Sequence, residues 1–377
     1  MLSQPPVWFI LIAFIAALGP LVFFHELGHY LVARWFGVGA ESFSIGFGHE
    51  IAGWTDKRGT RWKVGWLPLG GYVKFVGDLN PVSMPGEEEA HLSASERRRS
   101  FHHRPVWQRF LIVLAGPMAN FLLAILIFAA FFAIIGVPRT PNIVSQVEPG
   151  SAAAQVGLVR GDRIESIAGQ SVETFEDIRR IVSIRPGETV LINVDRAGRE
   201  MDLQARLGAT EVKDEFGQKF RIGMLGIMQS PRVPQHVPLL EVIPASVDYT
   251  FNLTRSMVDG LVQIISGERS TDELGGPLKM AQIAGQQASL GMFEFIQLVA
   301  LFSINLGFIN LLPVPMLDGG HLALYAVEAV QRRPVSLRAQ EWAFRGGLAF
   351  LLALLLFTTL NDLGSFGLWE SVGRLIG

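Results

Sequence analysis

Two long apolar runs constrain this chain more than any other feature of its sequence. Residues 7–24 contain no charged side chain, and the only strongly polar side chain in residues 110–137 is that of Asn120. A helix needs roughly 20 apolar residues to cross the hydrocarbon core of a bilayer, so both runs predict transmembrane helices. Two further runs, residues 293–312 and 346–360, predict a third span that contains several polar side chains and a short fourth span.

The composition agrees with a membrane protein and excludes several other classes. Hydrophobic residues make up 49% of the 377 residues and charged residues 18%, whereas soluble domains usually carry about 25% charge. The net charge of −2 offers no basic surface, so no nucleic-acid partner is expected. The chain has no cysteine, which excludes disulfides, thiolate metal sites and cysteine nucleophiles. Any metal ion must therefore be bound by His, Asp or Glu.

Arginines beside the apolar runs predict the orientation in the membrane. Short loops rich in Lys and Arg stay on the cytoplasmic side, whereas long translocated segments escape this rule. The flanking arginines are Arg34, Arg97, Arg98, Arg99, Arg104, Arg109, Arg332, Arg333 and Arg338. We therefore expect these flanks in the cytoplasm and residues 138–290 on the opposite side of the membrane.

The first apolar run contains the string HELGH, formed around His25, Glu26 and His29. Side chains four residues apart lie on one face of a helix, so the two imidazoles can bind one zinc ion while Glu26 handles a proton. Ionisable groups inside a membrane span are costly and mark functional sites. His25 follows Pro6 by about 28 Å of helix, which predicts a site near the cytoplasmic edge of a core about 30 Å thick.

A catalytic zinc ion takes three protein ligands and keeps one position for water. The third apolar run ends in NLLPVPMLDG, residues 310–319, where Pro313 and Pro315 should break the helix. Asp318 then offers a carboxylate from a loop at membrane depth, and a simple turn residue is the alternative interpretation. Two other histidines remain rival candidates for the third ligand: His49 and His321.

Residues 149–172, PGSAAAQVGLVRGDRIESIAGQSV, resemble the PDZ domains of bacterial membrane and periplasmic proteases. Short β-type runs surround a helical pattern at residues 174–184. PDZ domains bind a peptide as an added strand at an exposed sheet edge. The peptide-carboxylate loop of that family corresponds to residues 141–144, which carry no strong signature. Binding of a peptide or substrate tail and a purely steric role both remain open.

The order of the motifs resembles the site-2 protease family of intramembrane zinc metalloproteases. HELGH in a first span and NxxPxPxLDG in a later one carry the resemblance. Three further strings match the same family: GGYVKF at 70–75, AGPMANF at 115–121 and GGP at 275–277. A PDZ domain between the second and third spans is similar to the bacterial branch that cleaves anti-sigma factors, whose best-known member carries two such domains.

The resemblance implies one zinc ion per chain, bound by His25, His29 and Asp318, with Glu26 as the general base. It also implies a membrane-dipping hairpin that presents the substrate as an extended strand. We expect five further residues to bind substrate or support the transition state: Gly70, Gly71, Asn310, Pro313 and Pro315. For Asn310, a local helix cap is the alternative role.

The expected reaction is hydrolysis of peptide bonds in transmembrane segments of single-pass membrane proteins. The resemblance implies regulated intramembrane proteolysis of an anti-sigma factor or of remnant signal peptides, in the bacterial inner membrane with the PDZ domain in the periplasm. The expected partners are the lipid bilayer and these substrates. One alternative is a metal transporter, because intramembrane His and Asp also mark ion pathways. Another is a catalytically inactive, membrane-anchored PDZ scaffold.

The expected fold is a polytopic α-helical membrane protein with about four transmembrane helices, a membrane-associated β-hairpin region and an inserted, mainly-β PDZ domain. The expected segments, in chain order, are the first transmembrane helix (1–36), a membrane-dipping β region with a charged loop (37–104), the second transmembrane helix (105–138), the PDZ domain (139–208), a linker with an amphipathic membrane-surface segment (209–290), the third transmembrane helix (291–320), a cytoplasmic loop (321–341) and the fourth transmembrane helix with a C-terminal tail (342–377).

Overall fold

The computed structural model divides into two compact units, each with its own core. The first unit combines residues 1–129 with residues 243–377, and the second consists of residues 130–242. The residues that the structure describes are 5–77, 93–213, 219–271 and 274–365.

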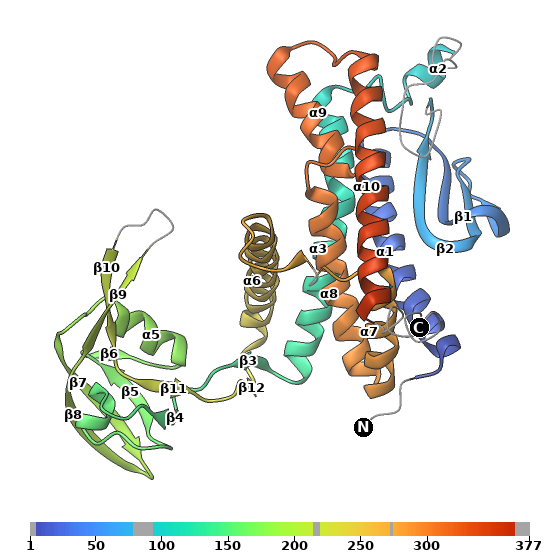
Figure 1. Ribbon diagram of the computed structural model, residues 1–377. Helices are drawn as coiled ribbons and strands as arrows, with labels where there is room; N and C mark the ends of the chain where they lie inside the picture. Colours follow the sequence, from blue (N-terminus) through green and yellow to red (C-terminus); the bar gives the residue numbers. More distant parts are fainter. Residues whose placement is uncertain (1–4, 78–92, 214–218, 272–273, 366–377) are drawn as a thin grey trace, which may run out of the picture. The chain divides into compact units, whose positions relative to one another are not determined.

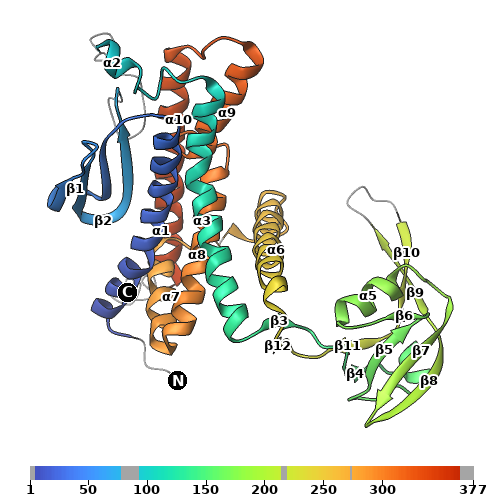
Figure 2. The same cartoon turned by 180° about the vertical axis from the view of Figure 1, so that it is seen from behind.

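The first unit is a bundle of helices with a small sheet beside it (Figures 1 and 2). Its helices are α1 (Val7–Trp35), α2 (Ala94–Arg97), α3 (Val106–Ile134), α6 (Leu239–Ile265), α7 (Pro277–Leu290), α8 (Met292–Leu311), α9 (Asp318–Gln331) and α10 (Leu337–Ser365). Four of them, α1, α3, α8 and α10, are long and apolar enough to cross a membrane. The expectation of four transmembrane helices is thereby confirmed.

The break between α8 and α9 follows from two prolines. A residue that precedes proline is pushed out of the helical region, and Leu312, just before Pro313, is extended with φ −63° and ψ 139°. The chain then turns through Pro315 and restarts as a helix at Asp318. Residues 321–341, expected to be a loop, contain most of α9, because the turn is completed within the proline motif itself.

A buried carboxylate of α10 holds the start of α7. Asp362 is 1% exposed, and its two oxygens accept hydrogen bonds from the backbone N–H groups of Gly276 and Lys279, each at 2.9 Å. The first N–H groups of a helix have no partner within the helix, and a negative charge there is also favoured by the helix dipole. A side chain at Gly276 would collide with this carboxylate. The second glycine of the GGP string thus leaves room for Asp362 of α10 to cap the N-terminus of α7.

The sheet beside α1 consists of two long, bent strands, β1 (Ala40–Thr55) and β2 (Arg61–Phe75). The first half of β1 pairs with both halves of β2, so that Phe43 lies opposite Trp62 on one side and opposite Val73 on the other. The second half of β1 pairs with the first half of β2. Residues 70–75 therefore form an outer edge, and no other strand in the described part of the chain pairs with it.

Aromatic side chains attach this sheet to α1. The ring of Trp62 stacks on Phe43 with centroids 4.3 Å apart and meets Tyr30 of α1 edge-on at 5.2 Å. The Tyr30 hydroxyl and the Trp62 indole N–H both donate to Asp56 in the turn between the strands. Aromatic pairs of this geometry contribute about 0.5–1.5 kcal/mol beyond their buried area, so the sheet is held against the helix that carries the HELGH string.

The second unit is mainly β. Its elements are β3 (Val137–Arg139), β4 (Val144–Val147), α4 (Ala152–Gln155), β5 (Arg163–Ile167), β6 (Gln170–Ser171), α5 (Phe175–Ser183), β7 (Thr189–Arg196), β8 (Arg199–Arg206), β9 (Gly208–Lys213), β10 (Lys219–Met224), β11 (Ile227–Gln229) and β12 (Val233–Gln235). The main sheet has the order β6-β5-β7-β8. The strand arrows and α5 are visible in Figure 1.

This unit reaches further along the chain than the segment expected for it. Strands β11 and β12 pair with β4 and β3, so residues up to 235 complete its sheets. Leu225 is buried in the same core as Ile164 and Ile192. The structure therefore differs from the linker expected from residue 209 onward: the β strands come first, and the helices α6 and α7 follow.

The GLxxGD string of the second unit serves its internal structure. Asp162 is fully buried and accepts two hydrogen bonds from the guanidinium of Arg196, at 2.7 and 2.8 Å. It also accepts one from the backbone N–H of Val159 at 2.9 Å. Because a buried charge is tolerated only when it is paired and hydrogen-bonded, this aspartate fixes the turn before β5 against the end of β7.

Candidate metal centre and active-site cavity

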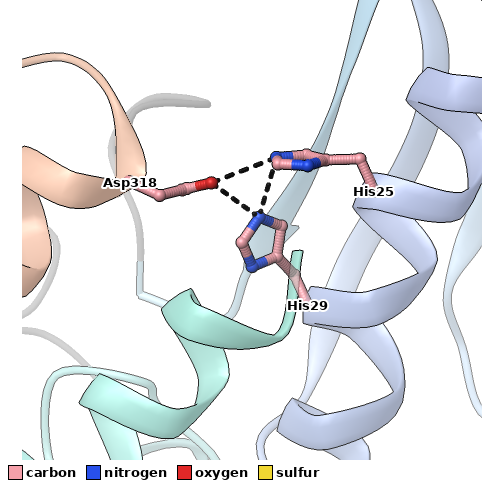
Figure 3. A group of neighbouring side chains, drawn as sticks. All are labelled: His25, His29 and Asp318. Atoms are coloured by element: carbon pink, nitrogen blue, oxygen red, sulfur yellow. Dashed lines mark hydrogen bonds and ion pairs between the residues drawn. The ribbon is translucent and has the colours of Figure 1, made fainter. Parts of the chain in front are cut away.

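Helix α1 presents two imidazoles to the first turn of α9 (Figure 3). His25 and His29 are 8% and 9% exposed, and their Nε2 atoms lie 3.3 Å apart. Asp318 Oδ2 lies 3.1 Å from Nε2 of His25 and 3.5 Å from Nε2 of His29. Within the described residues, these three side chains form the group of His, Asp and Glu that is able to hold a metal ion.

The three distances match the geometry of a zinc ion. Zinc binds imidazole nitrogen and carboxylate oxygen at about 2.0–2.2 Å in a tetrahedral arrangement, which separates the ligand atoms by about 3.3–3.5 Å. The observed separations of 3.1, 3.3 and 3.5 Å fall close to this value. Because His29 Nδ1 donates to a carbonyl, its neutral ring turns the Nε2 lone pair toward the carboxylate, and a cation at the centre makes this convergence of lone pairs favourable. The residues present therefore fit the ion.

Helix α3 supplies the outer hydrogen bonds of both rings. His29 Nδ1 donates to the backbone carbonyl of Ile112 at 2.9 Å, and the side-chain amide of Asn120 lies 3.1 Å from His25 Nδ1. A histidine that binds a metal through one nitrogen normally engages the other in such a bond, which fixes the ring and its tautomer. Gly116 lies between the two partners, where a side chain would collide with the His29 ring.

Glu26 lies between the histidines and the outer edge of the sheet. The backbone N–H of Val73 in β2 donates to its carboxylate. A Cβ atom at Gly71 would lie 3.1 Å from Glu26 Cγ and 2.7 Å from the Ser44 carbonyl oxygen. The absence of a side chain at Gly71 therefore lets the edge strand approach the carboxylate, and Glu26 is held beside the metal centre without taking part in it.

A cavity of about 370 Å³ opens over these groups. Its wall is formed by α1, the edge strand of β2, the start of α3, the end of α8 and the start of α9. The polar residues that line it are His25, Glu26, His29, Tyr72, Asn310, Asp318 and His321. The cavity is thus large enough for an extended peptide segment of a few residues beside the metal centre.

The other residues singled out from the sequence lie in different positions. Gly70, Gly71 and Asn310 line the cavity, whereas Pro313 and Pro315 do not belong to its lining. The prolines instead form the turn that brings Asp318 toward α1. Among the rival third ligands, His321 lines the cavity but its ring lies against Phe344 at 5.0 Å. His49 is exposed on β1.

Three contributors to this site were not singled out from the sequence: Asn120, the carbonyl of Ile112 and the N–H of Val73. Backbone groups leave no signal in the side-chain pattern. For Asn120 a signal was present, because it is the strongly polar residue of an otherwise apolar span and lies in the string AGPMANF. A buried polar side chain in a membrane helix requires a partner, and here the partner is a histidine of α1.

The sequence profile of peptidase family M50 matches residues 13–354. The chain belongs to peptidase family M50. One relative is Atu1380 of Agrobacterium fabrum, provisionally named a zinc metalloprotease. It is 45% identical over 360 residues, which cover 94% of this chain and 96% of that protein. Metalloprotease MmpA of Caulobacter vibrioides is 36% identical over 389 residues, covering 97% of this chain and 98% of its own length.

Membership of family M50 makes this protein a metalloprotease, and the cofactor of the family is zinc. The resemblance inferred from the motifs is thereby confirmed. Among solved structures, the PDZ domain of an SdrC-like protein from Listeria monocytogenes is similar over 25% of this chain and 93% of its own, with 24% identity and a TM-score of 0.19. A second PDZ domain, from Listeria innocua, covers 27% of this chain with a TM-score of 0.18.

Proposed function

We propose that this metalloprotease hydrolyses peptide bonds in the transmembrane segments of single-pass membrane proteins. His25, His29 and Asp318 hold the zinc ion, and Glu26 is the general base. The observation that carries the proposal is the convergence of three ligand atoms within 3.5 Å of one another at the end of a cavity bounded by membrane helices. Water and substrate both need access to such a site, and the cavity provides it.

When bound, zinc polarises the scissile carbonyl and lowers the pKa of a water molecule toward neutrality. Glu26 takes the proton of the attacking water and passes it to the leaving nitrogen. The Val73 N–H bond to the Glu26 carboxylate keeps that side chain pointed into the cavity. The Asn310 amide, on the cavity wall at the end of α8, donates to the oxygen on which negative charge develops, in the manner of an oxyanion hole.

The substrate binds as an extended strand along residues 70–75 of β2. One side of this strand pairs with β1, and its other side pairs with no strand among the described residues. Gly70 and Gly71 line the cavity beside Glu26. A strand edge offers unpaired N–H and C=O groups that bind an extended chain through main-chain hydrogen bonds. A helical transmembrane segment must unwind to bind in this way, and its freed backbone groups are then satisfied by the edge strand.

The proposed setting is regulated intramembrane proteolysis in the bacterial inner membrane, on an anti-sigma factor or on remnant signal peptides. Four helices able to span a membrane support a membrane location. The PDZ-like unit 130–242 lies on the extracytoplasmic side and either binds a substrate tail or excludes bulky ectodomains. The arginines that flank the spans support this orientation.

The test is cleavage of a single-span substrate in liposomes, followed by mass spectrometry of the products. Glu26→Gln keeps the size of the side chain but removes the base, so turnover is lost while zinc stays bound. Glu294→Gln is the matched control, because Glu294 also lies in a membrane-crossing helix, α8, but outside the cavity lining. Chelation abolishes cleavage by the wild type, and added zinc restores it. Cleavage by Glu26→Gln at the wild-type rate would contradict the assignment.

A further inference from the structure

A polar side chain in the middle of α3 contacts His25 at Nδ1, the ring nitrogen that points away from the metal centre. Asn120 is fully buried, and its amide nitrogen lies 3.1 Å from Nδ1 of His25. Its amide oxygen is also buried, and no hydrogen-bond partner for that oxygen occurs among the described residues. One half of the amide thus touches a ring of the HELGH string while the other half is unsatisfied, which is costly in an apolar interior.

The two orientations of this amide have opposite consequences for His25. If the amide nitrogen donates to Nδ1, the proton of a neutral imidazole must sit on Nε2. Nε2 then faces His29 and Asp318 with a hydrogen and cannot bind a metal ion. If the amide turns over, which exchanges two groups of nearly equal size, its oxygen accepts Nδ1–H. Nε2 then carries a lone pair, and the unsatisfied oxygen has gained its partner.

The contact of the neighbouring histidine with α3 supports the second orientation. His29 is held in the same manner, since its Nδ1 donates to the Ile112 carbonyl of α3 at 2.9 Å. The backbone at Asn120 is itself fixed, because the Ser303 hydroxyl of α8 donates to its carbonyl oxygen at 2.8 Å. Both Asn120 and Ser303 are fully buried. With the Asn120 amide turned over, α3 presents an acceptor to the Nδ1 atom of each imidazole.

We propose that Asn120 is a positioning residue of the metal centre: its amide oxygen accepts Nδ1–H of His25 and holds Nε2 unprotonated and directed at the ion. The inference rests on the proposed metal site at His25, His29 and Asp318 and adds to it a residue outside the ligand set. Partners of this kind are worth 10–100-fold in metal affinity in other proteins.

The test measures zinc affinity of the purified full-length protein in detergent, by competition with a chelating indicator. Asn120→Leu has nearly the same volume but no acceptor, and its zinc dissociation constant rises 10–100-fold. Asn120→Asp keeps an acceptor at the same place, and its dissociation constant stays within a few-fold of the wild type. Phe128→Leu, a conservative change at another buried position of α3, is the control for packing and leaves the affinity unchanged.

A second measurement does not depend on the stability of Asn120→Leu. In zinc-loaded protein labelled with ¹⁵N-histidine, the nuclear magnetic resonance spectrum of the wild type and of Asn120→Asp shows a slowly exchanging Nδ1–H for His25. The resonance is assigned by its loss in His25→Gln. Its absence from the wild type, or an unchanged zinc affinity in folded Asn120→Leu, overturns the role of Asn120.

Failure of the proposed metal site gives a different result. If His25→Gln and His29→Gln each bind zinc as tightly as the wild type, the ligand assignment is wrong and the role of Asn120 falls with it. If both lose zinc while Asn120→Leu retains it, the metal site stands and the role of Asn120 alone is wrong.

Discussion

The Cα atom of Gly116 in α3 lies directly against the imidazole of His29. A Cβ atom built on Gly116 would collide with Nε2 and Cε1 of that ring, and it would also lie 2.8 Å from Cδ2. The ring has little freedom to move away, because its Nδ1 is bound to Ile112. A missing side chain on one helix thus makes room for a proposed metal ligand on another.

Gly116→Ala is therefore expected to displace the His29 ring and weaken zinc binding by about tenfold or more, the size of effect produced when the support of a metal ligand is lost. Competition with a chelating indicator measures the change. Gly19→Ala in α1 is the matched control, since nothing lies within 4 Å of a Cβ atom at Gly19. Equal zinc affinity in both variants would contradict the expectation.

Two adjacent glycines of α10 provide a second comparison. A Cβ atom at Gly347 would lie 2.6 Å from the Cβ of Pro315, whereas nothing lies within 4 Å of one at Gly346. Gly347→Ala should push the proline turn and with it Asp318, and displacement of about 1 Å at a reacting centre costs up to 10²-fold in rate. Gly346→Ala should retain activity and gain about 0.5–1 kcal/mol of stability from helix propensity. The cleavage rates of the two variants measure the difference. An equal loss of cleavage rate in Gly346→Ala and Gly347→Ala would contradict the expectation.

Asp362→Ala should destabilise the helical unit by about 1–3 kcal/mol, because two backbone N–H groups at the start of α7 lose a buried acceptor. Asp362→Asn retains one acceptor oxygen and should lose less. Thermal unfolding in detergent measures both, with Asp259→Ala on the exposed side of α6 as the control. An Asp362→Ala protein as stable as the control would show that the cap contributes nothing.

The stability of the second unit should depend on acid through Asp162. Burial raises the pKa of this carboxyl, but the hydrogen bonds from Arg196 and from the Val159 N–H lower it by more than burial raises it. The pKa of Asp162 therefore lies below its ordinary value of 3.8. When the pKa of a carboxyl is lower in the folded state than in the unfolded state, the carboxyl contributes stability at pH values above its unfolded pKa. That contribution is lost as the pH falls through the pKa of the folded state. Unfolding of a 130–242 fragment, followed by circular dichroism, should show constant stability from this pair between pH 7 and 5 and a decline below about pH 4.

Arg196→Leu tests the origin of that acid dependence. The variant leaves the buried Asp162 without its guanidinium partner, so it should be less stable at pH 7 by about 1–3 kcal/mol. Because the variant no longer has the stabilising ion pair that protonation of Asp162 breaks, its free energy of unfolding should fall less below pH 4 than that of the wild type. A parallel decline in both proteins would assign the acid sensitivity to other groups.

The sequence predicted the parts of the fold that depend on local pattern. Apolar runs predict spans because the side chains of a membrane helix that face lipid must be apolar, and four such helices are present among the described residues. The prediction of a helix break at Pro313 follows from the same kind of local rule. The inserted, mainly-β unit was also expected, and the family was indicated by the order of its motifs.

Contacts between distant residues lay beyond that reasoning. Asp362 lies near the end of the fourth apolar helix, and its partners are backbone groups of α7. The pairing of β12 with β3 joins residues about 96 positions apart, and no sequence pattern marks a three-residue strand. The same holds for Asn120, whose polarity was noticed in the sequence but whose partner His25 belongs to another helix.

The spacing of the three clustered side chains along the chain has a consequence for biosynthesis. His25 and His29 leave the ribosome before Asp318, which follows about 290 residues later, roughly 15–60 s at ordinary rates of translation. Throughout that interval the two imidazoles are present without the carboxylate that completes the cluster. Under the proposed ligand set of His25, His29 and Asp318, a growing chain therefore lacks its third metal ligand until Asp318 has been synthesised.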